Sequence, residues 1–410
     1  MKYIDSYNLL KSKVNYNDDI IEIDKNITIR NFTFKSKFYT ILPGEKHYTC
    51  HQHNNYTTDK CYNFDNKVGI INEVLDIHDS QIEDNKLFRY HVISPANSNK
   101  TSQIVLMLHG FNEKHWYKYL PWAKNIVETT GKTMVLFPIA FHMNRAPQAW
   151  SNTRMMYEAS TQRKQQFPYI LHSSLSNIAI SSRIHAKPQR FVWSGLQSYY
   201  DVIQFIEDYK EGNHPFITPD AEIDIFAYSI GAFLSQILIM TNHKEYFSKS
   251  KLAMFCGGAV FNRLSPVSKF ILDSEANVNL YSFIVEHIES HLKKDERLNH
   301  YLNNTEHPEG ANFLSMLNYK VMSDMREDAF RKISNRIMAV ALTQDNVVLP
   351  YEIVNTLQGK NHDIPVNVYE TDLPYTYKHE DPFPALEKIK DEVDKCFKDI
   401  FSYISKFLLT

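Results

Sequence analysis

The segment with the clearest capacity for chemistry is Ala227-Tyr-Ser-Ile-Gly231, in which a serine separates an apolar run from a helical pattern. A serine on a sharp strand-to-helix turn projects its Oγ above the sheet, provided that the residues two positions away are small. Ala227 and Gly231 meet that condition, although the usual pattern has glycine at the first position. The sequence therefore predicts Ser229 as a nucleophile, supported by Tyr228 and Gly231. A turn serine in a catalytically silent protein is the alternative.

A serine hydroxyl needs a base within hydrogen-bond reach, and that base needs an acid to orient it. Asp345 follows the apolar run at residues 336–342, and His379 follows the run at residues 366–370. Each therefore lies just past a predicted strand, in the chain order Ser, Asp, His. The spacing predicts Asp345 as the acid and His379 as the base.

Each of these residues has a competitor. Asp345 could instead cap a helix that begins near Pro350, and Asp372 is a second candidate carboxylate. His362 competes with His379, but it precedes its strand and is expected at the opposite edge of the sheet.

Strands and helices alternate along most of the chain, a pattern typical of a mostly parallel, doubly wound sheet. Apolar runs and alternation predict strands at residues 20–24, 27–34, 87–93, 103–108, 133–138, 222–227, 252–256, 336–342 and 366–370. Helical spacing predicts helices at residues 122–129, 198–209, 230–240, 351–357 and 386–408.

Two connections are too long to be simple loops: about residues 139–193 and about residues 258–332. We expect both to form a helical cap within an α/β domain that spans residues 87–410. Residues 1–86 are expected to form an N-terminal extension with short strands. The aromatic stretch from Trp193 to Tyr200 is predicted to pack in the core and against the cap.

From about residue 87 to 408 the chain resembles the α/β-hydrolase superfamily. The run Asp345-Asn-Val-Val-Leu-Pro350 is similar to the acid loop of these enzymes, and His109-Gly110-Phe111-Asn112 is similar to their oxyanion loop. The resemblance implies a helical cap, Ser229 as nucleophile, His379 as general base and Asp345 as the orienting carboxylate.

The resemblance further implies an oxyanion hole made by the backbone N–H groups of Phe111 and Ile230, with Asn112 as an alternative to Phe111. His109 and Gly110 would brace this loop. More closely, the segments Ser176-Asn-Ile-Ala-Ile-Ser-Ser-Arg183 and Ser194-Gly-Leu-Gln-Ser-Tyr-Tyr-Asp201 resemble a bacterial family within the superfamily that has no assigned function.

These features predict a serine hydrolase that cleaves an ester, thioester or amide of a small-molecule acyl substrate through an acyl-enzyme. No cofactor and no metal ion are expected. An acyltransferase with the same three residues and a catalytically silent binding protein are the alternatives. Relatives with an aspartate nucleophile, such as dehalogenases and epoxide hydrolases, are disfavoured because the turn carries serine.

The composition excludes several classes of binding partner. The formal net charge is −2 with both signs interspersed, which argues against a nucleic-acid partner, and the 11 glycines include no phosphate-binding loop. No apolar run approaches the roughly 20 residues of a membrane helix, and the N-terminus lacks a signal-peptide pattern. We therefore expect a cytoplasmic protein, and the oligomeric state stays open.

The four cysteines, at positions 50, 61, 256 and 396, imply no disulfide framework. Cys256 is predicted in the core. The segment from His47 to Cys61, with His51 and His53, contains zinc-ligand types, but their intervals match no standard pattern, so a surface loop is favoured.

The first long insertion contains three arginines and a tryptophan, at Arg145, Trp150, Arg154 and Arg163. These side chains could face the site and select an anionic group. A solvated face is the more common role for arginines at this frequency.

Overall fold

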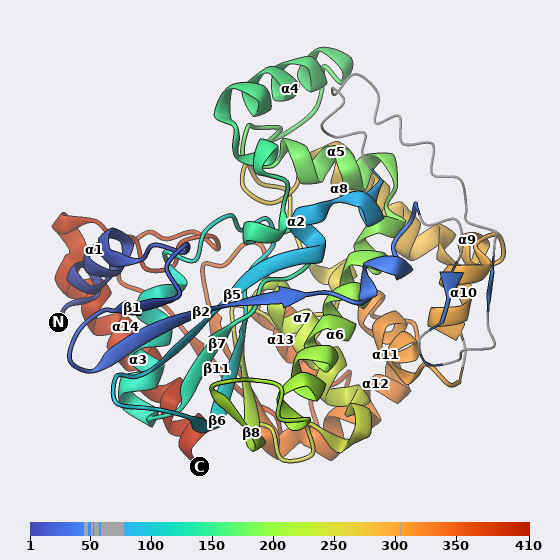
Figure 1. The fold of residues 1–410 in the computed structure, drawn as a ribbon. Coiled ribbons are helices and arrows are strands. Elements are labelled where there is room, and N and C mark those ends of the chain that lie inside the picture. Colours follow the sequence, from blue (N-terminus) through green and yellow to red (C-terminus); the bar gives the residue numbers. More distant parts are fainter. Residues whose placement is uncertain (45–47, 51, 53–56, 59–77, 304) are drawn as a thin grey trace.

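A nine-stranded sheet forms the centre of the molecule (Figure 1). The computed structural model describes all 410 residues except 45–47, 51, 53–56, 59–77 and 304. The strand order is β1-β2-β5-β7-β6-β8-β9-β10-β11; the six strands from β7 to β11 in this order are mutually parallel, whereas β1, β2 and β5 are antiparallel to their neighbours. The large sheet thus confirms the predicted mostly parallel, doubly wound arrangement.

The strands of the large sheet are β1 (Ile20–Glu22), β2 (Ile27–Lys35), β5 (Leu87–Pro95), β6 (Thr101–Leu108), β7 (Thr133–Leu136), β8 (Ile217–Tyr228), β9 (Leu252–Phe255), β10 (Ile337–Leu342) and β11 (Asn367–Thr371). A separate two-stranded sheet pairs β3 (Tyr48–Thr49) with β4 (Thr57–Thr58).

The α-helices are α1 (Tyr3–Lys13), α2 (Glu83–Lys86), α3 (Tyr119–Thr130), α4 (Thr153–Gln166), α5 (Ile178–Ala186), α6 (Gln189–Lys210), α7 (Ile230–Thr241), α8 (Ser274–Ser282), α9 (Ile288–Leu292), α10 (Glu296–Asn303), α11 (Pro308–Leu317), α12 (Ser323–Ile333), α13 (Pro350–Leu357) and α14 (Lys390–Leu409). Short 3₁₀ turns occupy Phe38–Ile41, Asp79–Gln81, Met143–Arg145, Gln148–Ser151, His243–Glu245, Phe261–Arg263, Ser334–Arg336 and Glu387–Ile389, and one π-helical turn spans Phe283–His287.

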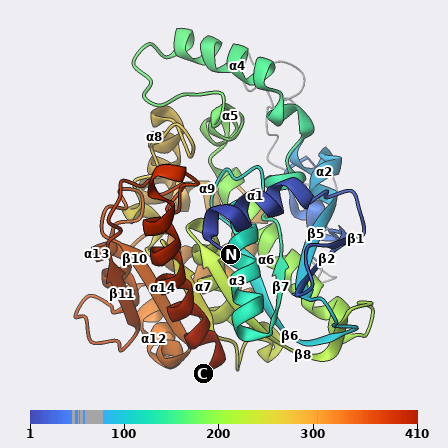
Figure 2. The ribbon, with the colours of Figure 1, turned by 90° about the vertical axis from the view of Figure 1, so that its left-hand side faces the viewer.

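Helices cover both faces of the sheet, as Figures 1 and 2 show from two directions. Helices α1, α3 and α14 pack on one face, and α6, α7 and α13 pack on the other. Within β6, Val105 and Met107 point into the first layer, while Ile104 and Leu106 point into the second. A strand buried on both faces needs apolar residues at every position, which explains the continuous apolar runs of the sequence.

Two elements are longer than the sequence predicts. Helix α6 begins at Gln189 instead of residue 198, because Gly195 does not break the helix: a Cβ there would lie 2.5 Å from the Phe313 ring, so the glycine permits close packing. Strand β8 begins at Ile217 instead of residue 222, and a register shift opposite Thr101 and Gln103 accommodates the extra residues around Pro219.

The N-terminal residues are joined to the rest of the molecule by the sheet. Strand β2 pairs with β5 from Ile27 opposite Pro95 to Lys35 opposite Leu87, and β1 extends the same edge. Just past β2, the Ser36 hydroxyl donates to Asp201 Oδ1 on α6 at 2.6 Å. The helix α1, which the sequence analysis did not predict, packs against α3 and α14.

The arginines of the first insertion do not form a solvated face. Arg145 is fully buried and pairs with Asp201 at 2.6 Å, and Arg163 pairs with the buried Asp273 at 2.7 Å. Only Arg154 is exposed, where it pairs with Glu158 one helical turn away. The expectation of a solvated face is therefore wrong for Arg145 and Arg163, because burial beside a carboxylate holds each guanidinium in the interior.

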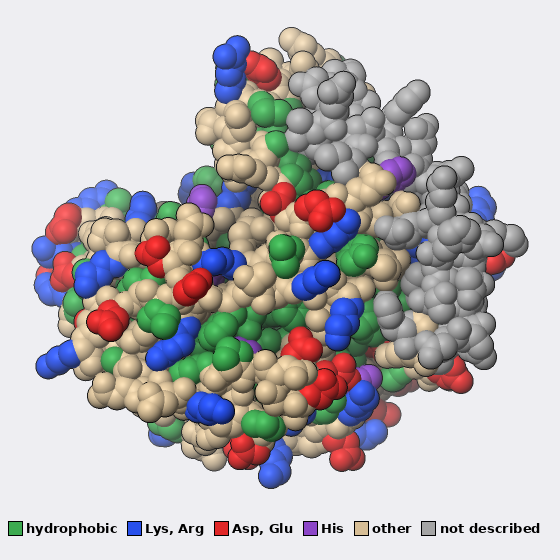
Figure 3. Space-filling view, in the orientation of Figure 1, with side chains coloured by type: hydrophobic (Ala, Val, Ile, Leu, Met, Phe, Trp, Pro, Cys, Tyr) green, Lys and Arg blue, Asp and Glu red, His purple; other side chains and the backbone are tan. Residues whose placement is uncertain are grey.

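The two long connections contain the remaining helices. Residues 139–188 supply α4 and α5, and residues 258–332 supply α8 to α12. Helix α5 packs against α8, while α4 projects away from the body in Figures 1 and 2. In the view of Figure 3, acidic and basic side chains are interspersed over the surface. No α-helix within the described part of the chain is both long and apolar enough for a membrane span.

Candidate active site

Ser229 occupies a strained turn between β8 and α7. Its φ of 55° and ψ of −121° lie in a region that L-residues rarely adopt. The Ser229 N–H donates to the Phe255 carbonyl at 3.2 Å and so stabilises the turn. Gly231 is required here, since a Cβ would lie 2.3 Å from the Leu108 carbonyl oxygen. Gly257 also gives room to the turn, which was not predicted from the sequence: a Cβ at this position would lie 2.8 Å from the Ser229 carbonyl oxygen.

The structure brings the three sequence-predicted side chains into one line. Ser229 Oγ lies 2.7 Å from His379 Nε2, and His379 Nδ1 lies 2.7 Å from Asp345 Oδ2. A carboxylate can only accept, so Nδ1 carries the proton and Nε2 presents its lone pair to the serine. His379 is 3% exposed and Asp345 is 2% exposed. We call these three residues the serine site.

The Asp345 carboxylate is held by several donors. Its Oδ1 accepts the N–H groups of Val347 at 2.9 Å and Val348 at 3.0 Å, which leaves Oδ2 for the histidine. The alternative role as the cap of α13 is not what the structure shows, since the N-cap residue is Leu349. The thiol of Cys256, predicted only as a core residue, also hydrogen-bonds Asp345, and burial together with that carboxylate raises the pKa of the thiol.

Tyr228, the residue before the serine, positions the histidine loop. Its ring stacks on the His379 ring with centroids 5.5 Å apart, and its hydroxyl donates to the His379 carbonyl. Lys118 contacts both Tyr228 and the histidine loop. Its Nζ is 4.7 Å from the Tyr228 ring centroid and donates to the Glu380 carbonyl at 2.7 Å. Lys118 also forms an ion pair with Glu113. The loop after β6 and the loop that carries His379 are thereby joined.

The loop after β6 is braced by His109. Its Nδ1–H donates to the Gly110 carbonyl at 2.8 Å, and its Nε2 accepts the Ile139 N–H at 2.9 Å. Both ring nitrogens of the neutral imidazole are thus hydrogen-bonded. Burial lowers the pKa of His109 well below its usual range. The Gly110 N–H donates to the Tyr119 hydroxyl at 2.9 Å, so this group is not available to a substrate.

Phe111 and Ile230, the predicted oxyanion donors, line the same pocket as Ser229. Ile230 is the first residue of α7, where backbone N–H groups have no acceptor within the helix. Asn112, the alternative to Phe111, has a φ of 59° and uses its side-chain amide to bind the carbonyls of Ser176 and Phe270. Asn112 therefore ties the loop to the cap segments.

The competing residues lie elsewhere. The exposed Asp372 accepts from Gln344 Nε2 at 3.0 Å and from the Tyr377 hydroxyl at 3.2 Å, so it links the acid loop to the histidine loop without reaching His379. His362 is exposed, and its Nε2 lies 2.9 Å from Asn355 Oδ1.

The pocket at Ser229 is apolar and narrow, with a cavity volume of about 30 Å³. Cap and loop residues form most of its wall: Phe191, Phe261, Leu264, Pro266, Ile271, Leu272, Leu280, Val347 and Val348. None of the arginines of the first insertion is among the lining residues, so the hypothesis that they select an anionic group in this pocket is wrong.

A wider hollow adjoins the pocket and shares Phe111 with it. Its cavity volume is about 660 Å³, and its wall combines apolar side chains with charged ones such as Lys118, Lys378 and Glu380. The site thus offers two environments, one small and apolar, the other wide and of mixed polarity.

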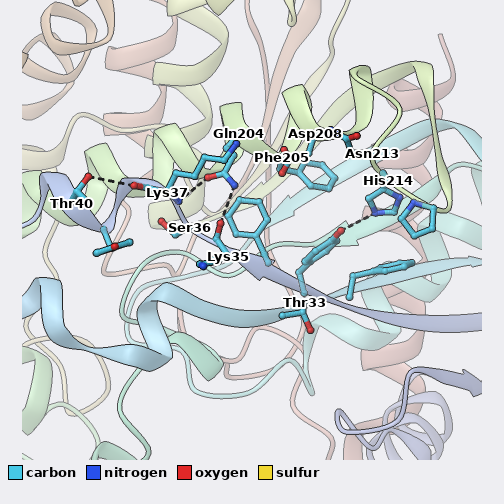
Figure 4. A pocket seen from close by; sticks show the side chains of 15 residues that line it. Thr33, Lys35, Ser36, Lys37, Thr40, Gln204, Phe205, Asp208, Asn213 and His214 are labelled. Carbon is cyan, nitrogen blue, oxygen red and sulfur yellow. Dashed lines mark hydrogen bonds between the residues drawn. The ribbon is translucent and has the colours of Figure 1, made fainter. Parts of the chain in front are cut away.

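Another hollow lies at the opposite end of the sheet, between β2, β5 and α6 (Figure 4). Its polar groups are largely paired with one another. Gln204 bridges the Lys35 carbonyl and the Lys37 N–H, and the Tyr90 hydroxyl lies 2.8 Å from His214 Nε2. Because these groups serve the packing of β2 on α6, we assign no chemistry to this hollow.

Cys50 departs from the predicted surface loop. It is 1% exposed, because its thiol packs against His300 and His307 of the helical cap. The surface-loop expectation is wrong for Cys50. His47, His51, His53 and Cys61, which belong to the same sequence segment, lie outside the described residues.

The layered sheet and the strand-to-helix turn at its centre are those of an α/β-hydrolase type of protein. The chain itself belongs to a family of unknown function (DUF6051), whose model matches residues 1–409. No curated protein matches the sequence.

Several solved structures are similar to this chain. A thermostable esterase from Pseudomonas putida has 8% identity and a TM-score of 0.42, with 100% of this chain and 91% of that chain covered. An esterase from the archaeon Pyrobaculum calidifontis has 10% identity and a TM-score of 0.41, with 100% and 90% covered. Carboxyl esterase 2 from the fungus Tuber melanosporum has 10% identity and a TM-score of 0.38, with 78% and 81% covered.

Proposed function

We propose that this protein is a serine hydrolase that cleaves a carboxylic ester through an acyl-enzyme on Ser229. The observation that carries the proposal is the pair of 2.7 Å contacts from Ser229 Oγ to His379 Nε2 and from His379 Nδ1 to Asp345 Oδ2. The strained turn supports it further, because strain at this serine is a cost that folding stability alone does not explain.

In the proposed reaction, Ser229 Oγ attacks the acyl carbon while its proton passes to His379 Nε2. The negative charge that develops on the carbonyl oxygen is stabilised by the N–H groups of Ile230 and Phe111, with the positive end of α7 behind the first. His379 then gives its proton to the leaving alcohol. Water, deprotonated by the same nitrogen, attacks the acyl-enzyme, and release of the acid restores the serine.

The two environments beside Ser229 favour one orientation of the substrate. The pocket at Ser229 is lined by apolar side chains apart from the serine itself, and its cavity of about 30 Å³ suits a small aliphatic acyl group. The wide hollow on the other side of Phe111, whose lining combines apolar and charged side chains, suits a bulkier alcohol. We infer an ester of a small apolar acid with a bulkier alcohol as the substrate class.

A fluorophosphonate probe and a series of p-nitrophenyl esters test this proposal. We expect the protein to be labelled at Ser229, and acetate and butyrate esters to be cleaved faster than palmitate. Ser229→Ala should abolish both, whereas the surface variant Ser248→Ala should leave both unchanged. Folded protein that is neither labelled nor active on any ester would contradict the proposal. Faster transfer to an added alcohol than to water would redefine the enzyme as an acyltransferase.

A further inference from the structure

A second group of reactive side chains lies in the helical cap, outside the serine site. Cys50 follows β3, His300 lies on α10, and His307 precedes α11. We call these three residues the cysteine–histidine cluster. Their exposed fractions are 1%, 7% and 0%. Cys50 and His307 are 257 positions apart in the sequence, so no local motif brings them together.

The donor atoms converge on one point. Cys50 Sγ lies 3.5 Å from His307 Nε2, His307 Nε2 lies 3.1 Å from His300 Nε2, and all three donor atoms lie within 4.8 Å of one another. A tetrahedral Zn²⁺ ion, with Zn–S of about 2.3 Å and Zn–N of about 2.0–2.1 Å, separates its S and N ligands by roughly 3.6 Å and two N ligands by roughly 3.4 Å. Both measured contacts are close to the edges of such a tetrahedron.

The surroundings of His307 set the tautomer that a metal ion requires. Its Nδ1 lies 2.6 Å from Glu309 Oε1, and a carboxylate accepts only, so Nδ1 carries the proton and Nε2 presents its lone pair to the cluster. The Tyr200 hydroxyl also donates to Glu309 and holds the carboxylate in place. A carboxylate behind a ligating histidine is a recurrent second layer of zinc sites, where it fixes the ring and increases its basicity.

Charge favours a divalent cation at this point. Glu309 is 1% exposed, and a thiolate at Cys50 would add a second buried negative charge. One Zn²⁺ ion balances both charges. Mixed sulfur and imidazole donors also suit zinc better than magnesium or calcium, which prefer oxygen.

We propose that Cys50, His300 and His307 bind a structural Zn²⁺ ion, which fastens Cys50, the residue after β3, to the helices α10 and α11. These three residues fill three of the four positions of a tetrahedral site. The row of thiol, imidazole and carboxylate also resembles a cysteine nucleophile with its base and acid. The second imidazole nitrogen, at 3.1 Å from the first, favours the metal site, because a nucleophile has no use for it.

Metal content tests the proposal on the full chain. Protein purified without chelator should contain about one zinc per chain by plasma mass spectrometry, and the variants Cys50→Ser, His300→Gln and His307→Gln should each fall below about a fifth of that. Cys396→Ser and His243→Gln, on α14 and beside α7, serve as matched controls and should retain it. Equal zinc in cluster and control variants would overturn the proposal.

Metal exchange keeps the test decisive if a cluster variant fails to fold. Wild-type protein stripped by a chelator should take up Co²⁺ with a thiolate-to-cobalt charge-transfer band, and adding Zn²⁺ should restore its Tm. If adding Zn²⁺ leaves the Tm of the stripped protein unchanged and adding Co²⁺ gives no charge-transfer band, the cluster is only a hydrogen-bonded array. Alkylation of Cys50 at the same rate with and without added Zn²⁺ would instead support the nucleophile and overturn the metal site.

Discussion

The serine site and the cysteine–histidine cluster are built from similar parts, yet their surroundings differ. In the first, a hydroxyl, an imidazole and a carboxylate lie in a row with contacts of 2.7 and 2.7 Å. In the second, a thiol, an imidazole and a carboxylate lie in a row with contacts of 3.5 and 2.6 Å. The first row ends at an apolar pocket, whereas the second meets another imidazole.

The two sites differ in the fourth neighbour, which is whatever lies beside the nucleophilic atom in addition to the row of three groups. At Ser229 that neighbour is the apolar pocket, which we propose receives the acyl group. At Cys50 it is His300 Nε2, which we propose shares a metal ion with the thiol. The two regions should therefore respond independently when each is altered.

The largest expected effect is on hydrolysis at the serine site. Ser229→Ala and His379→Ala should each lower kcat for a p-nitrophenyl ester by more than about 10³-fold, and the double variant should be little worse than either, because the residues act as a unit. Zinc content should not change. Steady-state kinetics with metal analysis on the same samples checks both; strictly additive losses would break the assignment.

Asp345→Asn should lower kcat by roughly 10²–10⁴-fold, because an amide at this position no longer enforces the proton on His379 Nδ1. Asp372→Asn is the matched control, since that carboxylate links Gln344 and Tyr377 without touching His379. We expect the control to stay within about threefold of wild type. A harmful Asp372→Asn beside a harmless Asp345→Asn would reverse the roles of the two carboxylates.

Metal removal should act on the other region alone. A chelator is expected to lower Tm by at least about 5 °C, because loss of the ion releases Cys50 from His300 on α10 and His307 before α11. Ester hydrolysis at 25 °C should stay within about twofold, since no residue of the serine site contacts the cluster. Calorimetry and initial rates measure the two effects; a parallel loss of activity in folded protein would show that the regions are coupled.

The smallest effect concerns Tyr228. Tyr228→Phe keeps the ring that stacks on His379 but removes the hydrogen bond to the His379 carbonyl. Loss of one such bond is worth about 1 kcal/mol, so kcat should fall by roughly fivefold with KM little changed. The exposed Tyr281→Phe is the control. An unchanged kcat in the Tyr228 variant would mean that Lys118 and Glu380 hold the histidine loop unaided.

The sequence predicted the parts of the fold that follow from local patterns. Apolar runs predicted the sheet strands from β5 to β11. The position just past a strand favoured Asp345 over Asp372 and His379 over His362. In the structure, Asp345 and His379 lie in a row with Ser229, whereas His362 contacts Asn355. The role of Asn112 as a brace was not predicted, because its partners Ser176 and Phe270 come from two distant insertions.

Other features depend on contacts that no local pattern contains. Cys256 is a core residue by its apolar surroundings, and only the tertiary structure places its thiol beside Asp345. Cys50 lies in a polar segment whose ligand intervals are irregular, because its partners His300 and His307 come from the far end of the cap insertion. The start of α6 at Gln189 was likewise not predicted, because the packing of Gly195 against Phe313 is a contact between distant parts of the chain.

The attachment of the N-terminal segment has a consequence for how the chain is made. During synthesis residues 27–35 leave the ribosome well before their strand partner at residues 87–95, and Ser36 must wait for Asp201, 165 positions later. Cys50 meets His307 257 positions later, and the Tyr3 N–H meets the Asp394 carboxylate last of all, 391 positions later. The first part of the polypeptide to be synthesised is thus among the last to be fixed, because α1 can dock on α14 only after most of the protein has emerged.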